Sequence, residues 1–377
     1  MARSIDVVVA GLGAMGSAAL YHLARRGVRV VGLDRYSPPH SLGSTHGLSR
    51  IIREAYYEHP LYVPLVQRAY ELWAELESLS GRSLFRQTGG LMIGPRDGTL
   101  VAGARRSARE HALIFDELTA DEARARFPAF AIPDGMSALH EPRAGVLDPE
   151  GGVAAHLELA RASGADVRAD EPVVRWHAER GRVRVVTAGG EYEAPRLALC
   201  TGAWTPSLVA DLPVLLNVER QVMHWFTPAR RAERFSPDHC PIAMIEYAPE
   251  RLFYILPDSG DGVKAAIHHE GILTNPEQVS RQISRDEVDR VRELLRQYLP
   301  DAAGTLRRSA TCLYTNTTDH HFLVDFHPRQ AEVLIVSACS GHGFKFASAI
   351  GEAVAQLLTT GDSDADLAPF RLERFLQ

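Results

Sequence analysis

The stretch that decides the fold is residues 5–16, Ile-Asp-Val-Val-Val-Ala-Gly-Leu-Gly-Ala-Met-Gly. Its first half, Ile5 to Ala10, is almost wholly apolar, which is typical of a parallel strand covered on both faces. The second half places glycines at Gly11, Gly13 and Gly16. This spacing allows a tight turn, a close approach of the backbone to a pyrophosphate and close packing of a helix on the strand. The stretch therefore predicts a strand that opens directly into a phosphate-facing helix.

The residues that follow complete a dinucleotide-binding unit. An alanine-rich helix is expected up to Gly27, and a second strand from Val28 to Asp34. Asp34 lies about 20 residues beyond the glycines, where a carboxylate can bind the ribose hydroxyls. Strand, turn, helix, strand and acid agree on a dinucleotide site and disfavour a purely structural glycine turn. Because NAD and FAD share an ADP half, the motif alone does not distinguish them.

Length and charge narrow the class of protein. A chain of 377 residues is too long for one simple core and predicts two or more domains. Its 41 basic and 47 acidic residues give a net charge of −6, which argues against a dominant nucleic-acid surface. No apolar stretch is long enough for a membrane helix, and little chain precedes the first strand for a signal peptide. We therefore expect a cytoplasmic protein that binds neither nucleic acid nor membrane.

The remaining pattern predicts one α/β part and one antiparallel part. Buried strands that run into glycines recur late in the chain, at Leu197–Gly202 and at Val333–Phe346, the latter followed by a helix. Residues 216–269 instead contain successive strands without intervening helices, which predicts an antiparallel sheet. The other expected elements are a strand over 85–93, helices near 105–111, from 119, over 149–164 and over 281–298, and a hairpin over 183–194.

The segment Gly43–Arg53, Gly-Ser-Thr-His-Gly-Leu-Ser-Arg-Ile-Ile-Arg, suits a chain lying along a cofactor, because it offers backbone amides and small hydroxyls. Arg50 and Arg53 lie three residues apart, so on a helical turn they would project from similar sides. For an arbitrary pair of arginines, the commoner interpretation is a solvated helix surface.

Taken together, the motifs resemble a known enzyme family. They are the N-terminal glycine motif, the Gly43–Arg53 segment, Thr311-Cys312-Leu313-Tyr314-Thr315, and Ser340-Gly341-His342-Gly343-Phe344-Lys345-Phe346. Nearly the whole chain is similar to the family of monomeric sarcosine oxidase, N-methyltryptophan oxidase and pipecolate oxidase. The resemblance implies an α/β fold: a Rossmann-type FAD-binding domain with a second α+β substrate domain built on an antiparallel sheet.

The resemblance also implies the cofactor and its contacts. Cys312 stands where the family attaches FAD covalently through sulfur, whereas a cysteine without this context is more often a small buried hydrophobe. Cys200, Cys240 and Cys339 keep that ordinary interpretation, and the four cysteines have no zinc-site spacing, so no metal is expected. The residues expected to contact FAD are Gly11, Gly13, Gly16, Asp34, Ser44, His46, Gly202, Cys312, Gly341, Gly343 and Phe344.

For the substrate, the resemblance implies two cations. Arg53 and Lys345 fall on positions that hold the substrate carboxylate, which is reasonable because the arginine fork binds carboxylate in a bidentate way and an ammonium adds charge. Tyr254 matches a pocket aromatic, and His268 matches a substrate-side histidine, although the pair His268-His269 leaves the register open by one.

Two further residues are expected to act on the flavin. Arg50 can offset charge on the reduced cofactor. Lys264 matches the lysine that promotes reaction with O₂, where a fixed cation lowers the cost of forming superoxide. The alternative for Lys264 is a solvated lysine at a strand edge. Arg50, Lys264 and His268 are thus the predicted catalytic residues.

The predicted domains are discontinuous, because motifs near both chain ends must meet on one cofactor. The FAD domain is expected to contain residues 1–82, 148–216 and 308–377, and the substrate domain residues 83–147 and 217–307. The expected activity is oxidation of a secondary amine amino acid to an imine, with molecular oxygen reduced to hydrogen peroxide. The alternatives are a dehydrogenase that reduces a quinone or protein, an NAD-dependent dehydrogenase, and a non-catalytic dinucleotide-binding protein. A monomer or small homo-oligomer is expected.

Overall fold

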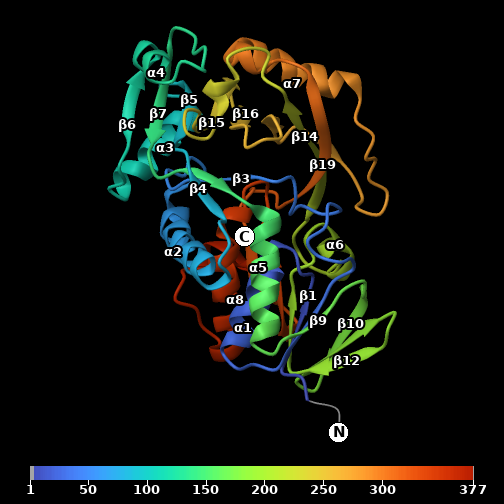
Figure 1. Ribbon diagram of the computed structural model, residues 1–377. Helices are drawn as coiled ribbons and strands as arrows, with labels where there is room; N and C mark the ends of the chain where they lie inside the picture. The colour runs from blue at the N-terminus through green and yellow to red at the C-terminus, as the bar shows by residue number, and fades with distance from the viewer. Residues whose placement is uncertain (1–3, 377) are drawn as a thin grey trace.

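The computed structural model describes residues 4–376 and contains two main sheets (Figure 1). The first sheet has the strand order β20-β21-β13-β1-β2-β9, in which only β20 runs antiparallel to its neighbour. Its strands are β1 (Val7–Ala10), β2 (Val30–Leu33), β9 (Asp166–Arg168), β13 (Arg196–Leu199), β20 (Leu323–His327) and β21 (Gln330–Ser337). The predicted Rossmann-type sheet is therefore confirmed, and it draws strands from both ends of the chain.

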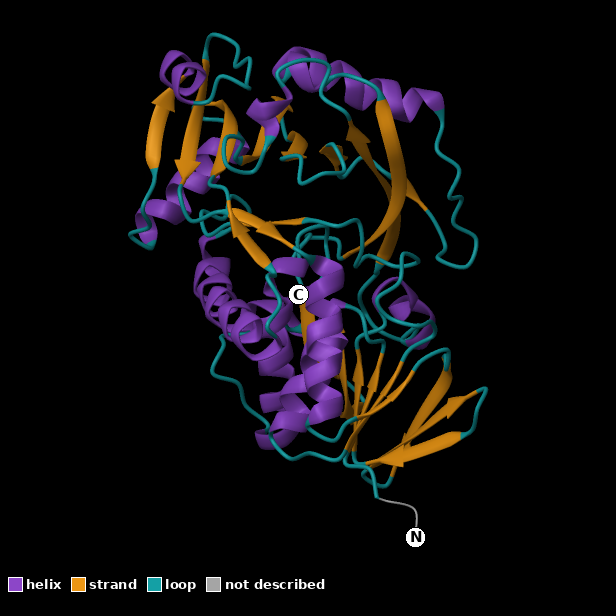
Figure 2. Ribbon diagram, viewed as in Figure 1, coloured by secondary structure: helices purple, strands orange, loops and turns teal. Residues whose placement is uncertain are grey.

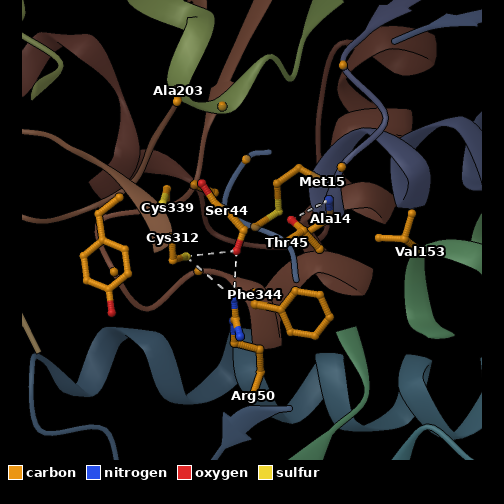
Figure 3. A pocket seen from close by; sticks show the side chains of 18 of the residues that line it. Ala14, Met15, Ser44, Thr45, Arg50, Val153, Ala203, Cys312, Cys339 and Phe344 are labelled. Carbon is orange, nitrogen blue, oxygen red and sulfur yellow. Dashed lines mark hydrogen bonds between the residues drawn. The ribbon is translucent and has the colours of Figure 1, made fainter. Parts of the chain in front are cut away.

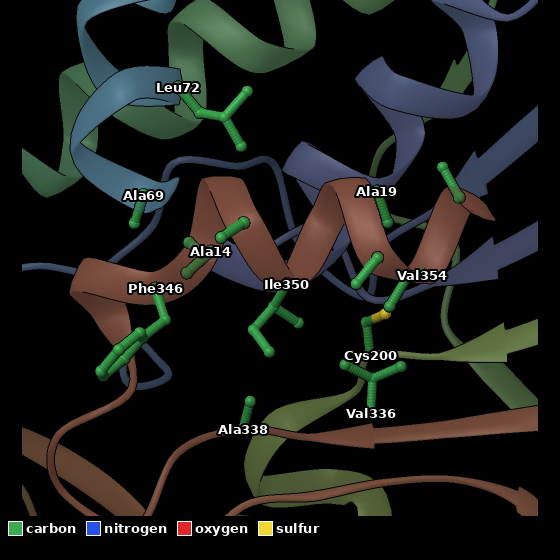
Figure 4. Close-up of a cluster of buried hydrophobic side chains, with 14 of the residues drawn as sticks. Ala14, Ala19, Ala69, Leu72, Cys200, Val336, Ala338, Phe346, Ile350 and Val354 are labelled. Carbon is green, nitrogen blue, oxygen red and sulfur yellow. The ribbon is translucent and has the colours of Figure 1, made fainter. Parts of the chain in front are cut away.

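Helices cover one face of this sheet (Figure 2). They are α1 (Ala14–Arg25), α2 (Val63–Ser80), α5 (Pro149–Ala162) and α8 (Ala347–Thr360). Phe346, Ile350 and Val354 point from the α8 segment into the buried cluster that also contains Val336 and Ala338 (Figure 4). This apolar layer fixes the ends of β1 and β21, and therefore the glycine turns that follow them.

A small antiparallel sheet covers the opposite face. It consists of β10 (Val173–Glu179), β11 (Arg182–Thr187) and β12 (Glu191–Ala194), and it includes the predicted hairpin. Val183 and Val185 of β11 pack against Val8 and Leu197 of the parallel sheet. Both faces of β1 are thus buried, as its unbroken apolar sequence predicts.

The second main sheet is largely antiparallel, with the order β18-β14-β17-β16-β15-β5-β7-β6 and β19 paired to β14. Only β15 and β5 run parallel. Its strands are β5 (Gly90–Pro95), β6 (Asp116–Thr119), β7 (Met136–Glu141), β14 (Asn217–Phe226), β15 (Ile242–Ala248), β16 (Arg251–Leu256), β17 (Val263–His268), β18 (Ile272–Leu273) and β19 (Leu306–Asn316). The antiparallel part of the fold prediction is confirmed.

This sheet separates core residues from site residues by strand alternation. In β17, Val263 and Ala265 pack toward α7 (Arg285–Tyr298), in one cluster with Leu295. Lys264 and His268, at alternate positions, line a cavity on the other face. Because side chains of a strand alternate between faces, one sequence supplies both the core and the site.

A third, short sheet lies between the two main ones and corrects one expectation. It consists of β3 (Arg50–Ile52), β8 (Gly145–Leu147) and β4 (Phe85–Gln87). Arg50 and Arg53 therefore do not lie on a helical turn, because Arg50 pairs with Leu147 in a strand. The β-branched pair between the arginines favours this extended conformation. Arg53 is only 1% exposed, so the solvated interpretation is wrong for it.

Several element boundaries also differ from expectation. The run over 85–93 is two strands, β4 and β5, because the chain changes sheet at Thr88–Gly89. Helix α3 (Thr99–Glu110) begins before residue 105 because the Glu246 carboxylate, remote in sequence, accepts the amides of Thr99 and Leu100. Helix α7 begins at Arg285, after a Ser284 capping box.

Helix α4 (Ala120–Arg126) starts as expected, with Thr119 as its cap. The short helix α6 (Thr205–Leu208) follows β13. Within residues 4–376, no helix has the length and apolar character needed to cross a membrane. The predicted domain boundary at residue 308 falls inside β19, which pairs with β14, and the division into domains remains a prediction.

Candidate active site

One elongated cavity lies where the parallel strands end, and the second sheet closes its other side. Residues at the carboxyl ends of four parallel strands line it: Gly11 after β1, Asp34 after β2, Cys200 after β13 and Ser337 at the end of β21. The second sheet contributes Met223, Met244, Tyr254, Leu256, Lys264, His268, Cys312 and Tyr314. In open α/β sheets, ligands bind beyond the carboxyl ends of the strands, so this cavity is the expected site.

The N-terminal glycine turn fits a pyrophosphate. A Cβ on Gly16 would lie 1.7 Å from the carbonyl oxygen of Gly11, so Gly16 serves the close packing of helix on strand. A Cβ on Gly13 would meet only the Thr45 hydroxyl, at 3.5 Å, because Gly13 faces the cavity. Helix α1 has no side-chain cap and no acid in its first turn, so its positive end is available to an anion.

Asp34 follows the neighbouring strand β2, and its side chain lies beside this glycine turn. Its carboxylate accepts the amide of Leu12 at 2.6 Å and that of Tyr36 at 2.8 Å. The side chain is 5% exposed and lines the cavity. Asp34 therefore braces the glycine turn, while its binding to ribose remains a prediction.

The other predicted cofactor residues line the same cavity, with the exceptions of Gly16 and His46. Ser44, Gly202, Cys312, Gly341, Gly343 and Phe344 all line it. Gly16 does not, because it is used in packing. His46 is buried but is also not among the lining residues, and burial and Arg50 lower the pKa of its ring to about 3. His46 is therefore a neutral ring outside the cavity.

Cys312 lies in β19 with its sulfur at the cavity wall (Figure 3). The Sγ atom is 3.4 Å from the carbonyl oxygen of Ser44 and 3.8 Å from Nη2 of Arg50. Cys339 also lines the cavity and was not predicted to do so. Its Sγ accepts the amide of Thr315 at 3.4 Å.

Arg50 is fixed by backbone carbonyls. Nη2 donates to Ser44 O at 2.8 Å, and Nη1 donates to Ser49 O at 2.9 Å. These carbonyls are neutral, and no ion pair within the described chain includes Arg50. Its positive charge is therefore uncompensated at the cavity wall, where it can stabilise an anion.

Arg53 is held by groups that the sequence did not single out. Nη1 donates to Ala55 O at 2.9 Å, and Nη2 donates to Oε2 of Glu58 at 2.7 Å. Burial opposes the charge, but the nearby Glu58 carboxylate raises the pKa of Arg53 above its ordinary value. Glu58 also lines the cavity. Glu58 lies only five residues after Arg53, but no periodicity in Glu58-His59-Pro60 indicates that its carboxylate turns back onto the guanidinium.

Lys345 is the second cation predicted for the substrate. Its Nζ donates to His342 O at 2.7 Å and to the Tyr56 hydroxyl at 3.2 Å. The Tyr56 ring also faces Arg53, whose Cζ lies 4.3 Å from the ring centroid, against 5.2 Å for Lys345 Nζ. Burial and Arg53 lower the pKa of Lys345 to about 7. The structure thus brings both predicted cations, which line the cavity, onto the ring of Tyr56, which is buried behind them.

Lys264 is 2% exposed, which rules out a solvated lysine at a strand edge. Its Nζ donates to Gly47 O at 3.0 Å, Ser49 O at 2.7 Å and the Ser49 hydroxyl at 3.4 Å. Burial and Arg50 lower its pKa well below the ordinary value. Since an ammonium has three donors and no lone pair, these acceptors suit the charged form and oppose that shift.

Of the pair His268-His269, His268 lines the cavity and His269 does not, so the substrate-side role stays predicted for His268. Nδ1 of His268 lies 3.2 Å from the hydroxyl of Tyr314. Burial and His269 lower the pKa of His268 well below its ordinary value, which favours a neutral ring. Tyr254 also lines the cavity, and burial raises its pKa to about 12.

These features define the class of protein. A cavity that runs from a phosphate-facing helix end to a pair of buried cations fits an extended dinucleotide with a small anionic substrate beyond its reactive ring. Within residues 4–376, no group of three or more histidine, cysteine or acidic side chains is placed to hold a metal ion. The fold and site are those of a dinucleotide-dependent oxidoreductase.

Comparison with known proteins gives the family. A model of the FAD dependent oxidoreductase family matches residues 6–357, and the chain belongs to that family. It is 44% identical over 365 residues to a monomeric sarcosine oxidase of Streptomyces avermitilis, covering 96% of this chain and 95% of that protein. It is 34% identical over 372 residues to an N-methyl-L-tryptophan oxidase of Yersinia pestis, covering 98% and 99%.

A solved structure agrees with these matches. NikD, described as an unusual amino acid oxidase essential for nikkomycin biosynthesis, superimposes with a TM-score of 0.85 at 26% identity, covering 98% of this chain and 97% of that one. Within its family, the chain is a FAD-dependent amine oxidase of the sarcosine oxidase type, with a CH–NH donor and oxygen as acceptor. The predicted family and enzyme class are confirmed.

Proposed function

We propose that the protein oxidises a secondary amine amino acid, namely sarcosine, another N-methyl amino acid or a cyclic imino acid, to an imine with formation of hydrogen peroxide. The observation that carries this proposal is the pair of buried cations, Arg53 and Lys345, against the ring of Tyr56. A carboxylate placed there would gain two charge-assisted contacts in a dry site. The names of the relatives, which act on sarcosine and N-methyl-L-tryptophan, support the same substrate class.

The amine end of the substrate would lie among neutral groups. His268 is held neutral by burial, and Tyr254 keeps its proton because burial raises its pKa to about 12. Met244 and Leu256 add apolar surface. Such surroundings disfavour an ammonium and favour the unprotonated amine, whose lone pair assists cleavage of the neighbouring C–H bond.

FAD supplies the redox chemistry, because its ring accepts two electrons from the C–H bond and can pass them to oxygen. The glycine turn after β1 would hold the pyrophosphate, and Cys312 is proposed to attach the flavin through its sulfur. Arg50, which forms no ion pair within residues 4–376, would stabilise negative charge on the ring. Lys264 would place a positive charge where oxygen is reduced. This charge lowers the free energy of forming the superoxide anion from neutral O₂.

A substrate panel tests this proposal. Sarcosine, N-methyltryptophan, pipecolate and proline are each incubated with the purified holoenzyme, and hydrogen peroxide is measured. We expect peroxide from at least one of them and none from dimethylamine or piperidine, which lack the carboxylate. Two outcomes would contradict the proposed carboxylate site. They are equal turnover of the amines without a carboxylate, and turnover that survives replacement of both Arg53 and Lys345 by methionine.

A further inference from the structure

A single peptide unit joins two opposite charges beside the cavity. Its carbonyl, Gly47 O, accepts the Lys264 ammonium at 3.0 Å. Its N–H, on Leu48, donates to the Glu150 carboxylate, 3.1 Å from Oε2 and 3.2 Å from Oε1. The peptide dipole thus has its negative end at the cation and its positive end at the anion, an alignment in which each hydrogen bond strengthens the other.

Glu150 is held in place to serve this loop. It follows Pro149 in the first turn of α5, after the Asp148 cap, where the helix dipole stabilises a carboxylate. Its Oε1 also accepts the amide of Gly47 at 2.7 Å. Among residues 4–376 it has no ion-pair partner, and it does not line the cavity. Its described hydrogen bonds are therefore to the loop amides alone.

The loop needs such support because its own residues do not explain its conformation. Leu48 has a φ of +65°, a left-handed conformation that side chains other than glycine adopt at a cost. Its side chain is 42% exposed, so packing of the leucine offsets little of this cost. The contacts that hold residues 47–49 are polar: Glu150 binds the amides, and Lys264 and Arg50 bind the carbonyls.

We propose that Glu150 is a positioning residue for Lys264: it fixes the Gly47–Leu48 peptide so that the loop oxygens hold the ammonium at the cavity, and it thereby sets the rate at which oxygen reacts with the reduced enzyme. This inference rests on the proposed role of Lys264. The Glu150 charge also opposes the fall in the pKa of Lys264 that burial and Arg50 cause. Glu150 does not touch the substrate site, so oxidation of the amine does not depend on it.

The experiment compares Glu150→Gln with a matched control on the same helix, Glu158→Gln, which replaces an exposed carboxylate paired with Arg82. Each holoenzyme is reduced anaerobically with substrate and then mixed with oxygen in a stopped-flow instrument. Loss of a hydrogen-bonded charge predicts that Glu150→Gln slows reoxidation about tenfold and leaves flavin reduction unchanged. The Glu158→Gln enzyme should match the wild type in both steps.

A double-mutant cycle and hydrogen exchange make the test specific. The Glu150→Gln/Lys264→Met enzyme should reoxidise no more slowly than Lys264→Met alone, because Glu150 acts through Lys264. Amides 47 and 48 should exchange faster with deuterium in Glu150→Gln than in the wild type. Three outcomes would overturn the role of Glu150 and leave that of Lys264 standing. They are additive effects of the two mutations on the reoxidation rate, unchanged exchange of amides 47 and 48 in Glu150→Gln, and normal reoxidation of Glu150→Gln when Lys264→Met is slow. Normal reoxidation of Lys264→Met would overturn the proposed role of Lys264 as well.

Discussion

Nη2 of Arg53 lies 2.7 Å from Oε2 of Glu58, and both side chains line the cavity. The other carboxylate oxygen, Oε1, and the Nε atom of Arg53 are buried without a hydrogen-bond partner in the described structure. The two charges of the pair therefore cancel, but Nε of Arg53 and Oε1 of Glu58 can still form hydrogen bonds with a ligand. Its two members have separable roles, which mutations can distinguish.

Replacement of Arg53 by methionine should cost stability as well as activity. The change leaves Glu58 as a buried carboxylate without its partner, and breaking such a pair costs roughly 3 kcal/mol. The free energy of unfolding, measured in urea, should fall by about that amount for Arg53→Met. Arg53→Met/Glu58→Gln should recover most of this loss and remain inactive. A double variant as unstable as the single one would show that the charge pair is not the cause.

Lys345 should make carboxylate binding depend on pH. Its pKa is about 7 in the free protein, below the ordinary lysine value, so the ammonium is present below pH 7 and is lost as the pH rises. A bound carboxylate requires the charged form, so above this pKa binding must take up a proton. The dissociation constant of propionate, which has no amine to oxidise, should therefore rise by up to about tenfold per pH unit above pH 7.

The same titration in Lys345→Met supplies the control. Binding of propionate, followed by the change in flavin absorbance, should be weaker and nearly independent of pH over this range. A pH dependence that survives in the variant would assign the titration to another group.

Mutation can test whether flavin is attached at Cys312, as predicted, and not at Cys339, another thiol that lines the cavity. Cys312→Ser should release its flavin into the supernatant on acid precipitation, whereas Cys339→Ser should retain yellow colour in the pellet. Cys339 is a useful control because it also lines the cavity, while its Sγ has a different partner, the amide of Thr315. Colour released from the wild type would refute the attachment but not the cofactor.

Two glycines of the first turn should respond differently to alanine. In Gly16→Ala the new methyl group would lie 1.7 Å from Gly11 O, so the helix must move from the strand and the melting temperature should fall. In Gly13→Ala the methyl group meets no protein atom closer than 3.5 Å, so the apoprotein should keep its stability and bind FAD more weakly. Thermal unfolding of apoprotein and titration with FAD measure the two effects. Equal flavin affinity in Gly13→Ala and the wild type would contradict close contact with the pyrophosphate.

The structural features that the sequence predicted correctly are those that depend on a local pattern of residues. The apolar run Ile5–Ala10 and the glycines after it correctly indicated a buried parallel strand with a dinucleotide cavity at its end. The successive strands expected over residues 216–269 are likewise present in the second main sheet. Such features depend on residues that are neighbours in the sequence, so they can be predicted without knowledge of the tertiary structure.

Contacts between distant segments were not predictable in this way. Glu246, in β15, accepts an amide at the start of helix α3, and Glu150, in α5, accepts the amides of Gly47 and Leu48, more than 100 residues earlier in the chain. Nor does sequence show which thiols reach the cavity, as the unexpected position of Cys339 demonstrates. An isolated glutamate carries no local signature, and only tertiary packing determines its partner.

The strand order has a consequence for biosynthesis. Strand β1 lies between β2 and β13, and β13 pairs in turn with β21, which follows β1 by more than 300 residues. At 5–20 residues per second, roughly 16 to 65 seconds separate translation of β1 from that of β21. A polypeptide that lacks β21 and the segment after it lacks the cavity wall formed by residues 336–345, so we expect the cofactor site to form only after these residues have been translated.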